Sequence, residues 1–142
     1  VADVSVEELR AHTKYGVGVS ANQRHIRYFW TAMRRFTPQQ RSLFLRFVWG
    51  RSRLPVNATE WGDAKFTLHP KQTARADTHF PVAHTCFFSL ELPAYSSASV
   101  CYERLLYAVT HCQSIDIDTT SSARENRDLQ SLSDDDEGAV DE

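Results

Sequence analysis

The chain has 142 residues, of which 42% are hydrophobic and 24% charged, and its formal net charge is −2. A chain of this length builds one domain around a single core and is too short for two. No apolar run approaches the ~20 residues that cross a bilayer, and the N-terminus lacks the basic and apolar regions of a signal peptide. We therefore expect a soluble, intracellular protein that binds no membrane, placed in the cytoplasm or alternatively in the nucleus.

Charge is distributed unevenly along the chain. Residues 1–60 carry ten Lys and Arg against four Asp and Glu, whereas residues 61–142 carry six against fourteen. Much of the acidic charge lies in the final SDDDEGAVDE, a run typical of a solvated tail. We expect a folded domain over residues 1–118 and a disordered tail, rich in Ser, Asp and Glu, over residues 119–142.

Three cysteines are present, and none of them forms a C-x-x-C pair. An odd number cannot pair completely, so the pattern indicates neither a disulfide framework nor a common structural zinc site. It favours thiols in a reducing compartment.

Residues 4–15 fit a short helix or a strand equally well, and the glycine-containing residues 16–20 predict a loop. A helix is predicted over residues 20–36, because Ser20 can cap its N-terminus and Gln23 can complete a capping box. Its apolar residues recur at helical spacing and form one face: Ile26, Phe29, Trp30, Met33 and Phe36.

A second helix follows at once. Thr37 is its predicted cap, Pro38 takes the first helical position, Gln40 supplies the capping-box partner, and Gly50 is a natural stop. Its inner face is predicted to consist of Leu43, Phe44, Phe47 and Val48.

The next segments alternate between loops and short strands. Residues 51–64 and 70–80 predict loops, and residues 65–69 a short strand. FFSLEL alternates like a half-buried strand, with Phe88, Leu90 and Leu92 on one face and Phe87, Ser89 and Glu91 on the other.

A third strong helix is predicted over residues 96–113. Helices mixed with strands in this way favour a small α+β domain in which a few strands are covered by helices. Within the third helix, the spacing of Cys101, Leu105, Ala108 and Cys112 puts all four on one face. We interpret both of these cysteines as small core residues.

Cys86 differs, because it lies where an irregular segment containing Pro81 gives way to a strand. Exposed functional groups are frequent at such junctions. His84 is two residues away, so the two side chains would point the same way in an extended backbone, and an imidazolium near a thiol favours the reactive thiolate. A regular strand through Cys86 would turn its thiol toward the core, so a nucleophile requires that pairing begin only after it.

Other interpretations of Cys86 stay open from the residues alone. Most lone cysteines are packing residues. A metal site would need His69, His79 and His84 beside Cys86, a spacing that matches no compact motif. A Cys-His protease would need partners that nothing in the sequence singles out.

Two long blocks of the sequence resemble one family. FPVAHTCFFSLELPAYSS with the helix YERLLYAVTHC is similar to the catalytic segment of HECT ubiquitin ligases, and YFWTAMRRFTPQQRSLFLRFVWGRSRLP resembles their preceding helix pair. SLFLRFVWGRSRLP and SIDID look closest to the large HERC-type members. The resemblance runs from about Val4 to Asp118, and Phe80 departs from the family's usual Leu.

The resemblance implies the C-terminal lobe of a HECT domain, a small antiparallel sheet of about four strands with surrounding helices. In this family an N-terminal lobe, absent from this sequence, binds the charged ubiquitin-conjugating enzyme (E2), and a flexible hinge joins the two lobes. Cys86 would accept ubiquitin as a thioester and pass it to a lysine of a protein substrate, without a cofactor or a metal.

The resemblance also implies supporting roles. Thr85 and Phe87 would shape the loop and hold the ubiquitin tail, and His84 would either assist electrostatically or order the loop. Asp116 or Asp118 would orient the incoming lysine, although acids after a helix are more often only solvated. Ile115 falls near the place where many members carry an aromatic residue.

Two rival functions remain. The basic residues of the first half could form a binding surface for nucleic acid or protein, although a solvated helix face is the simpler account, and we expect no nucleic-acid partner. Alternatively, the isolated lobe folds but cannot load itself with ubiquitin.

Overall fold

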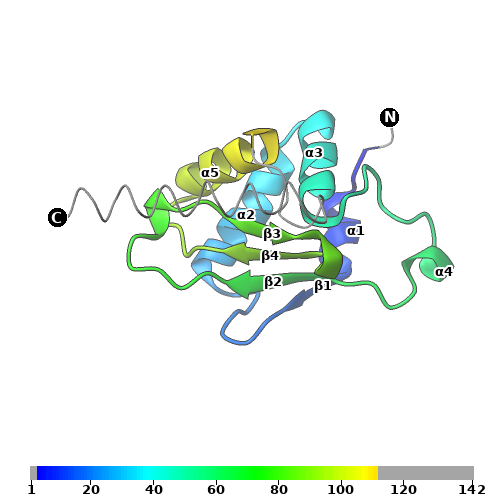
Figure 1. The fold of residues 1–142 in the computed structure, drawn as a ribbon, viewed down its shortest axis with the longest axis horizontal. Helices are drawn as coiled ribbons and strands as arrows, with labels where there is room; N and C mark the ends of the chain where they lie inside the picture. Colours follow the sequence, from blue (N-terminus) through cyan, green and yellow to red (C-terminus); the bar gives the residue numbers. More distant parts are fainter. Residues whose placement is uncertain (1–2, 112–142) are drawn as a thin grey trace, which may run out of the picture.

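The computed structural model describes residues 3–111, which form a four-stranded sheet with a layer of helices against it (Figure 1). The elements in chain order are α1 Val6–Ala11, β1 Thr13–Tyr15, α2 Arg24–Arg35, α3 Pro38–Trp49, α4 Ala58–Trp61, β2 Phe66–Pro70, β3 Val82–His84, β4 Ser89–Leu92 and α5 Ala98–His111. This arrangement confirms the predicted α+β class and the predicted number of strands.

The strands follow the order β1-β2-β4-β3. β1 pairs with β2 and β2 with β4 in parallel, and only β3 pairs with β4 in the antiparallel sense. The expected antiparallel sheet is therefore wrong for two of the three pairings. The physical reason lies in the connections. Between β1 and β2, the long segment carrying α2, α3 and α4 returns the chain to the starting end of the sheet, as a parallel pair requires. Between β2 and β4 the chain runs back through β3, so β4 has the direction of β2.

α3 begins and ends where the sequence predicts. The Gln40 amide donates to the Thr37 hydroxyl (3.2 Å) and the Thr37 amide donates to the Gln40 side chain (2.9 Å), which completes the capping box. Gly50 ends the helix with φ of +79°, a conformation that glycine adopts without steric cost.

The predicted inner face of α3 needs one correction. Leu43 is 37% exposed, whereas Leu45 is fully buried beside the correctly predicted Phe44, Phe47 and Val48. The buried arc extends to Leu45 because α3 contacts α5 as well as β3, β4 and the turn between these two strands.

α2 starts four residues later than predicted. Its N-cap is Gln23, which caps with no side-chain hydrogen bond. The Gln23 side chain instead accepts from the Ser20 amide (3.0 Å) and donates to the Gly18 carbonyl (3.2 Å), so Ser20 belongs to a turn before the helix. The five residues predicted for the apolar face, Ile26, Phe29, Trp30, Met33 and Phe36, are all buried.

The shorter elements were the least predictable. Residues 4–15 contain both alternatives in succession, α1 and then β1. The expected loop at 51–64 contains the single-turn helix α4, which Asn57 caps by accepting from the Glu60 amide (2.8 Å). β3 was not predicted, because its three residues carry too little pattern.

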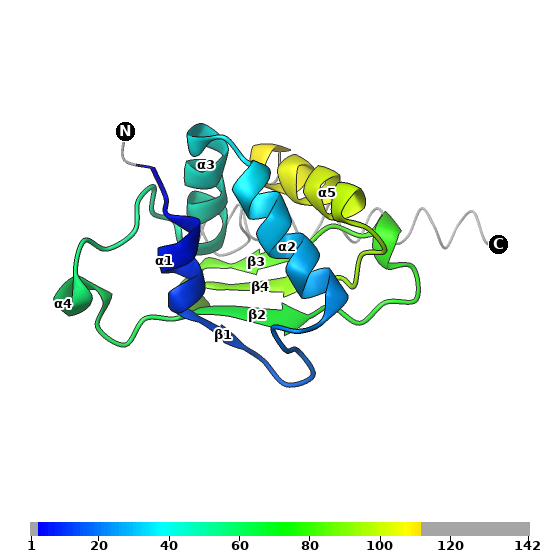
Figure 2. The same cartoon turned by 180° about the vertical axis from the view of Figure 1, so that it is seen from behind.

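α1, α2, α3 and α5 cover one face of the sheet (Figure 2). The core between the layers is aromatic-rich, and its largest fully buried side chains include Trp30, Phe29, Phe44 and Phe66. Cys101, Leu105 and Ala108 of α5 are buried in it, as their shared face predicts. Cys112 and the tail at 119–142 lie outside the described residues. Every helix within residues 3–111 is too short or too polar to cross a membrane.

Candidate functional site

Cys86 lies at the tip of the β3–β4 hairpin. Residues Thr85–Phe87 form a 3₁₀ turn, and Phe88 then takes a left-handed conformation (φ 49°, ψ 57°) before β4 begins at Ser89. Cys86 therefore lies in the turn between two paired strands and outside regular pairing itself, so the strand parity of Phe88, Leu90 and Leu92 does not extend to its side chain. Cys86 is an exposed residue.

The end of α3 lies beside this turn. Thr85 and Cys86 line a hollow of about 390 Å³ together with Arg46, Trp49 and Gly50. Arg46 and Trp49 are the side chains of α3 that share this hollow with Cys86. The hollow is open to solvent.

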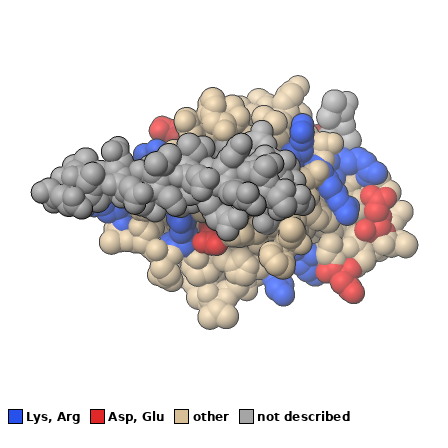
Figure 3. All heavy atoms as spheres, in the orientation of Figure 1, with Lys and Arg blue, Asp and Glu red and all other residues tan. Residues whose placement is uncertain are grey.

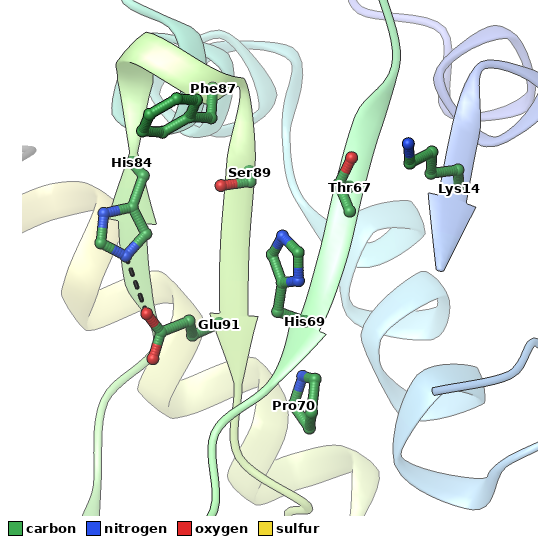
Figure 4. A pocket seen from close by; sticks show the side chains of 8 residues that line it. All are labelled: Lys14, Thr67, His69, Pro70, His84, Phe87, Ser89 and Glu91. Atoms are coloured by element: carbon green, nitrogen blue, oxygen red, sulfur yellow. Dashed lines mark hydrogen bonds and ion pairs between the residues drawn. The ribbon is translucent and has the colours of Figure 1, made fainter. Parts of the chain in front are cut away.

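The other two predicted residues belong to a different hollow, on the face of the sheet opposite the helices. His84 and Phe87 line this hollow of about 640 Å³ (Figure 4). Its remaining lining comes from Lys14, Thr67, His69, Pro70, Ser89 and Glu91. Phe87 is 75% exposed, so an apolar group that docks here meets an aromatic ring already in solvent.

His84 forms an ion pair across the hairpin. Its Nε2 lies 2.8 Å from a carboxylate oxygen of Glu91, and both side chains are about one-third exposed. This contact joins the ring on β3 to a side chain of β4 (Figure 4). The expectation that His84 and Cys86 point the same way assumed an extended backbone, and the 3₁₀ turn replaces it, so the two side chains line different hollows.

Cys101 provides the contrast with Cys86. It is fully buried in α5, and burial raises the pKa of its thiol to about 12. A thiol in that environment is neither ionised nor accessible at neutral pH. Of the two cysteines in residues 3–111, only Cys86 is thus placed to react.

Several residues of the site were not predicted. Arg46 and Trp49 come from α3 and line the hollow of Cys86. The sequence places Glu91 on one face of its strand but does not predict its contact with His84. The alternation in FFSLEL does put Glu91 on the same face as Phe87, but its pairing with His84 depends on β3, which has no sequence signal. Asp116, Asp118 and Ile115 lie outside the described residues.

The alternative metal site finds no support in the geometry. In the part of the chain from residue 3 to residue 111, no group of three or more His, Cys, Asp or Glu side chains could hold a metal ion. His69 and His84 line the sheet hollow, whereas Cys86 lines the hollow beside α3.

Comparisons with known proteins agree on one family. The family described as HECT-domain (ubiquitin-transferase) matches residues 1–118. E3 ubiquitin-protein ligase HERC2 of Homo sapiens is 39% identical over 117 residues, which cover 82% of this chain and 2% of that protein. E3 ubiquitin-protein ligase NEDD4 of Homo sapiens is 36% identical over 121 residues, covering 82% of this chain and 9% of that protein. The chain therefore spans only a small part of the curated relatives it matches.

Proposed function

Because this chain belongs to the HECT-domain (ubiquitin-transferase) family, we propose that it is the lobe that carries the acceptor cysteine of an E3 ubiquitin ligase. Cys86 takes ubiquitin from a charged E2 and passes it to a lysine of a protein substrate. The observation that carries this proposal is the exposed thiol at the tip of the β3–β4 hairpin, in contrast to the buried Cys101.

The first step exchanges one thioester for another. The Cys86 thiolate attacks the carbonyl carbon at the C-terminus of ubiquitin, a new carbon–sulfur bond forms, and the bond to the E2 sulfur breaks, so that the E2 leaves as a thiolate. The two esters are similar in energy, and the reaction needs position and thiolate more than a large reduction of the barrier. A turn whose ends are fixed in two paired strands supplies that position.

The second step is attack on the Cys86 thioester by the neutral amine of a lysine. An amide bond forms, the carbon–sulfur bond breaks, Cys86 is released as a thiolate, and the proton of the amine passes to water or to a nearby base. Asp116 or Asp118 is our proposal for the group that orients this lysine.

The surroundings of the thiol support two auxiliary roles. Arg46 in the thiol's hollow attracts the negative charge that develops on the ester oxygen during either step. Phe87, largely exposed and lining the neighbouring hollow on the sheet, offers apolar contact to the extended C-terminal tail of ubiquitin. Thr85 shapes the turn, and His84 with Glu91 holds the adjoining sheet surface.

A basic nucleic-acid surface is the competing function, and the one face drawn in Figure 3 does not favour it. On the visible, described part of the face in Figure 3, Lys and Arg groups are interspersed with Asp and Glu rather than joined in one stripe. Binding to the phosphate backbone would depend steeply on salt. The chain should show no retention on DNA or RNA at low ionic strength.

The test needs the docking lobe that the family resemblance implies. We would make a chimera in which this chain replaces the segment of human NEDD4 that aligns with it, and incubate it with a ubiquitin-charged E2. The chimera should form a ubiquitin adduct that reductant removes, and Cys86→Ala should abolish it. Cys101→Ala is the matched control and should lower stability while keeping the adduct. A reductant-sensitive adduct on the Cys86→Ala protein would contradict the proposal.

A further inference from the structure

Phe88 adopts a backbone conformation that its side chain disfavours. Within residues 3–111 it is the one non-glycine residue with positive φ, at 49°. A turn followed by a left-handed residue is a common way to close a hairpin, but glycine or asparagine normally takes the left-handed position. A bulky residue there is an outlier that persists only where its surroundings enforce it.

The ring of Trp49 provides the enforcing contact. It stacks on Phe88 with a centroid distance of 3.9 Å and an angle of 5° between the planes. Phe88 is only 4% exposed, and its ring also lies 5.4 Å from that of Phe66 in β2. The backbone is held as well, since the Thr67 amide donates to the Phe88 carbonyl (3.1 Å).

Trp49 is itself held by a series of ring contacts reaching back to α1. Its ring lies 5.9 Å from that of Trp61, and the guanidinium of Arg51 lies 4.1 Å from its centroid. Trp61 in turn stacks on His12 at 3.7 Å and donates a hydrogen bond to Glu8 (3.0 Å). The Trp49 indole, which stacks on Phe88 of the turn, is therefore also held by residues outside the turn.

We infer that Trp49 is a positioning residue for the Cys86 thiol. It lines the hollow of that thiol and stacks on the residue that closes the turn. By holding Phe88 in its left-handed conformation, it keeps Thr85–Phe88 in one arrangement and the sulfur in one orientation. This inference rests on the proposed function of Cys86, since a fixed orientation matters only if the thiol must meet a large, aligned acyl donor.

The expected effect follows from the geometry of transfer. A misplacement of the attacking atom by about 1 Å can slow a reaction by roughly 100-fold. Trp49→Ala should therefore slow single-turnover loading of the chimera by roughly 10- to 100-fold, and Trp49→Phe should recover most of the rate. Alkylation of Cys86 by iodoacetamide, which needs no alignment, should stay within about twofold.

A double-substitution cycle separates this role from general stability. Asparagine adopts the left-handed conformation readily, so Phe88→Asn should make the turn independent of the indole. In the Phe88→Asn background, Trp49→Ala should then slow loading by less than about threefold. The difference from its larger effect in the parent chimera would measure the coupling between the two positions. Leu105→Ala is the matched control, since it opens a cavity in α5, a helix that Figure 1 places away from the turn.

Amide hydrogen exchange on the unmodified 142-residue chain provides a readout that does not involve ubiquitin. The Phe88 amide donates to the Thr85 carbonyl within the turn, and the Thr67 amide donates from β2 to the Phe88 carbonyl. Trp49→Ala should accelerate exchange of these two amides by at least about tenfold relative to the rest of the sheet. Leu105→Ala should affect the sheet uniformly.

The outcomes are distinct. Slower loading and faster local exchange in Trp49→Ala, both relieved by Phe88→Asn, support the inference. Loading and exchange equal to those of the parent protein overturn it while leaving the proposed function intact. If the parent chimera does not load at all, the proposed function fails, and the exchange of the two amides alone decides whether Trp49 holds the turn.

Discussion

The two described cysteines should differ in reactivity by orders of magnitude. Burial raises the pKa of the Cys101 thiol to about 12, so at pH 8 only about one molecule in 10⁴ carries the thiolate. The small thiolate fraction of Cys101 alone therefore slows its alkylation strongly, because the thiolate is the form that reacts. Because Cys101 has 0% exposure, its alkylation also requires opening of the core, which lowers its rate further.

The assay is a timed pulse of iodoacetamide at pH 8, quenched and read by mass spectrometry of the individual cysteine peptides. Cys112→Ser removes the thiol that lies outside the described residues, so that only two sites compete. We expect Cys86 to be labelled at least about 10³-fold faster than Cys101, and both to be labelled in denaturant. Cys86→Ser is the control and should leave the folded chain without a fast site.

Two results would refute this reasoning. Labelling of Cys101 at a rate comparable to that of Cys86 would mean that the core around α5 is not closed. Labelling of Cys86 only after denaturation would mean that its thiol is covered in the folded chain, and a covered thiol cannot accept ubiquitin.

Three further substitutions test the site and its supports. Phe87→Ala should change the free energy of unfolding by less than about 0.5 kcal/mol, because the ring is 75% exposed, yet it should slow ubiquitin loading. A loading rate equal to that of the parent chimera would contradict the proposed contact of Phe87 with ubiquitin. Thr37→Ala should lower the free energy of unfolding by about 1 kcal/mol, measured in urea, since it deletes the capping box of α3. Hydrogen bonds from Ser96 hold the pKa of Asp77 below its ordinary value of 3.8. The ionised Asp77 therefore stabilises the fold above pH 3.8, and this stabilisation is lost as the pH falls through the lower pKa of the folded state. Thermal melts between about pH 6 and pH 3 should therefore show a weaker acid dependence for Asp77→Asn, and an unchanged one would contradict this assignment.

The helices were the most predictable part of the fold. Thr37, Pro38, Gln40 and Gly50 determine the limits of α3 through local hydrogen bonds and backbone preference, and these act over four or five residues. The start of α2 was not predictable in the same way, because the Gln23 side chain turns back to Gly18 instead of capping the helix. Two acceptable local arrangements compete there, and the sequence pattern does not distinguish them.

Strand direction and the site partners depend on tertiary structure. β1 and β3 have three residues each, too few for an alternating pattern. The parallel pairing of β1 with β2 depends on the helices between them, and that of β2 with β4 depends on β3, which runs back between them in the chain. The position of Cys86 just before a strand was predictable from the alternation in FFSLEL, which begins directly after it. The contacts of Trp49 with Phe88 and of His84 with Glu91 were not, since each joins two elements whose packing no local pattern specifies.

The most direct test is to trap the acyl intermediate on the side chain at position 86. In the chimera, Cys86→Ser should accept ubiquitin slowly from the charged E2 as an oxygen ester, which resists reductant and is cleaved by mild base. Mass spectrometry of the digested adduct should find the C-terminal residues of ubiquitin attached at position 86. An adduct at any other residue, or a reductant-sensitive adduct in that variant, would contradict the assignment of Cys86 as the acceptor.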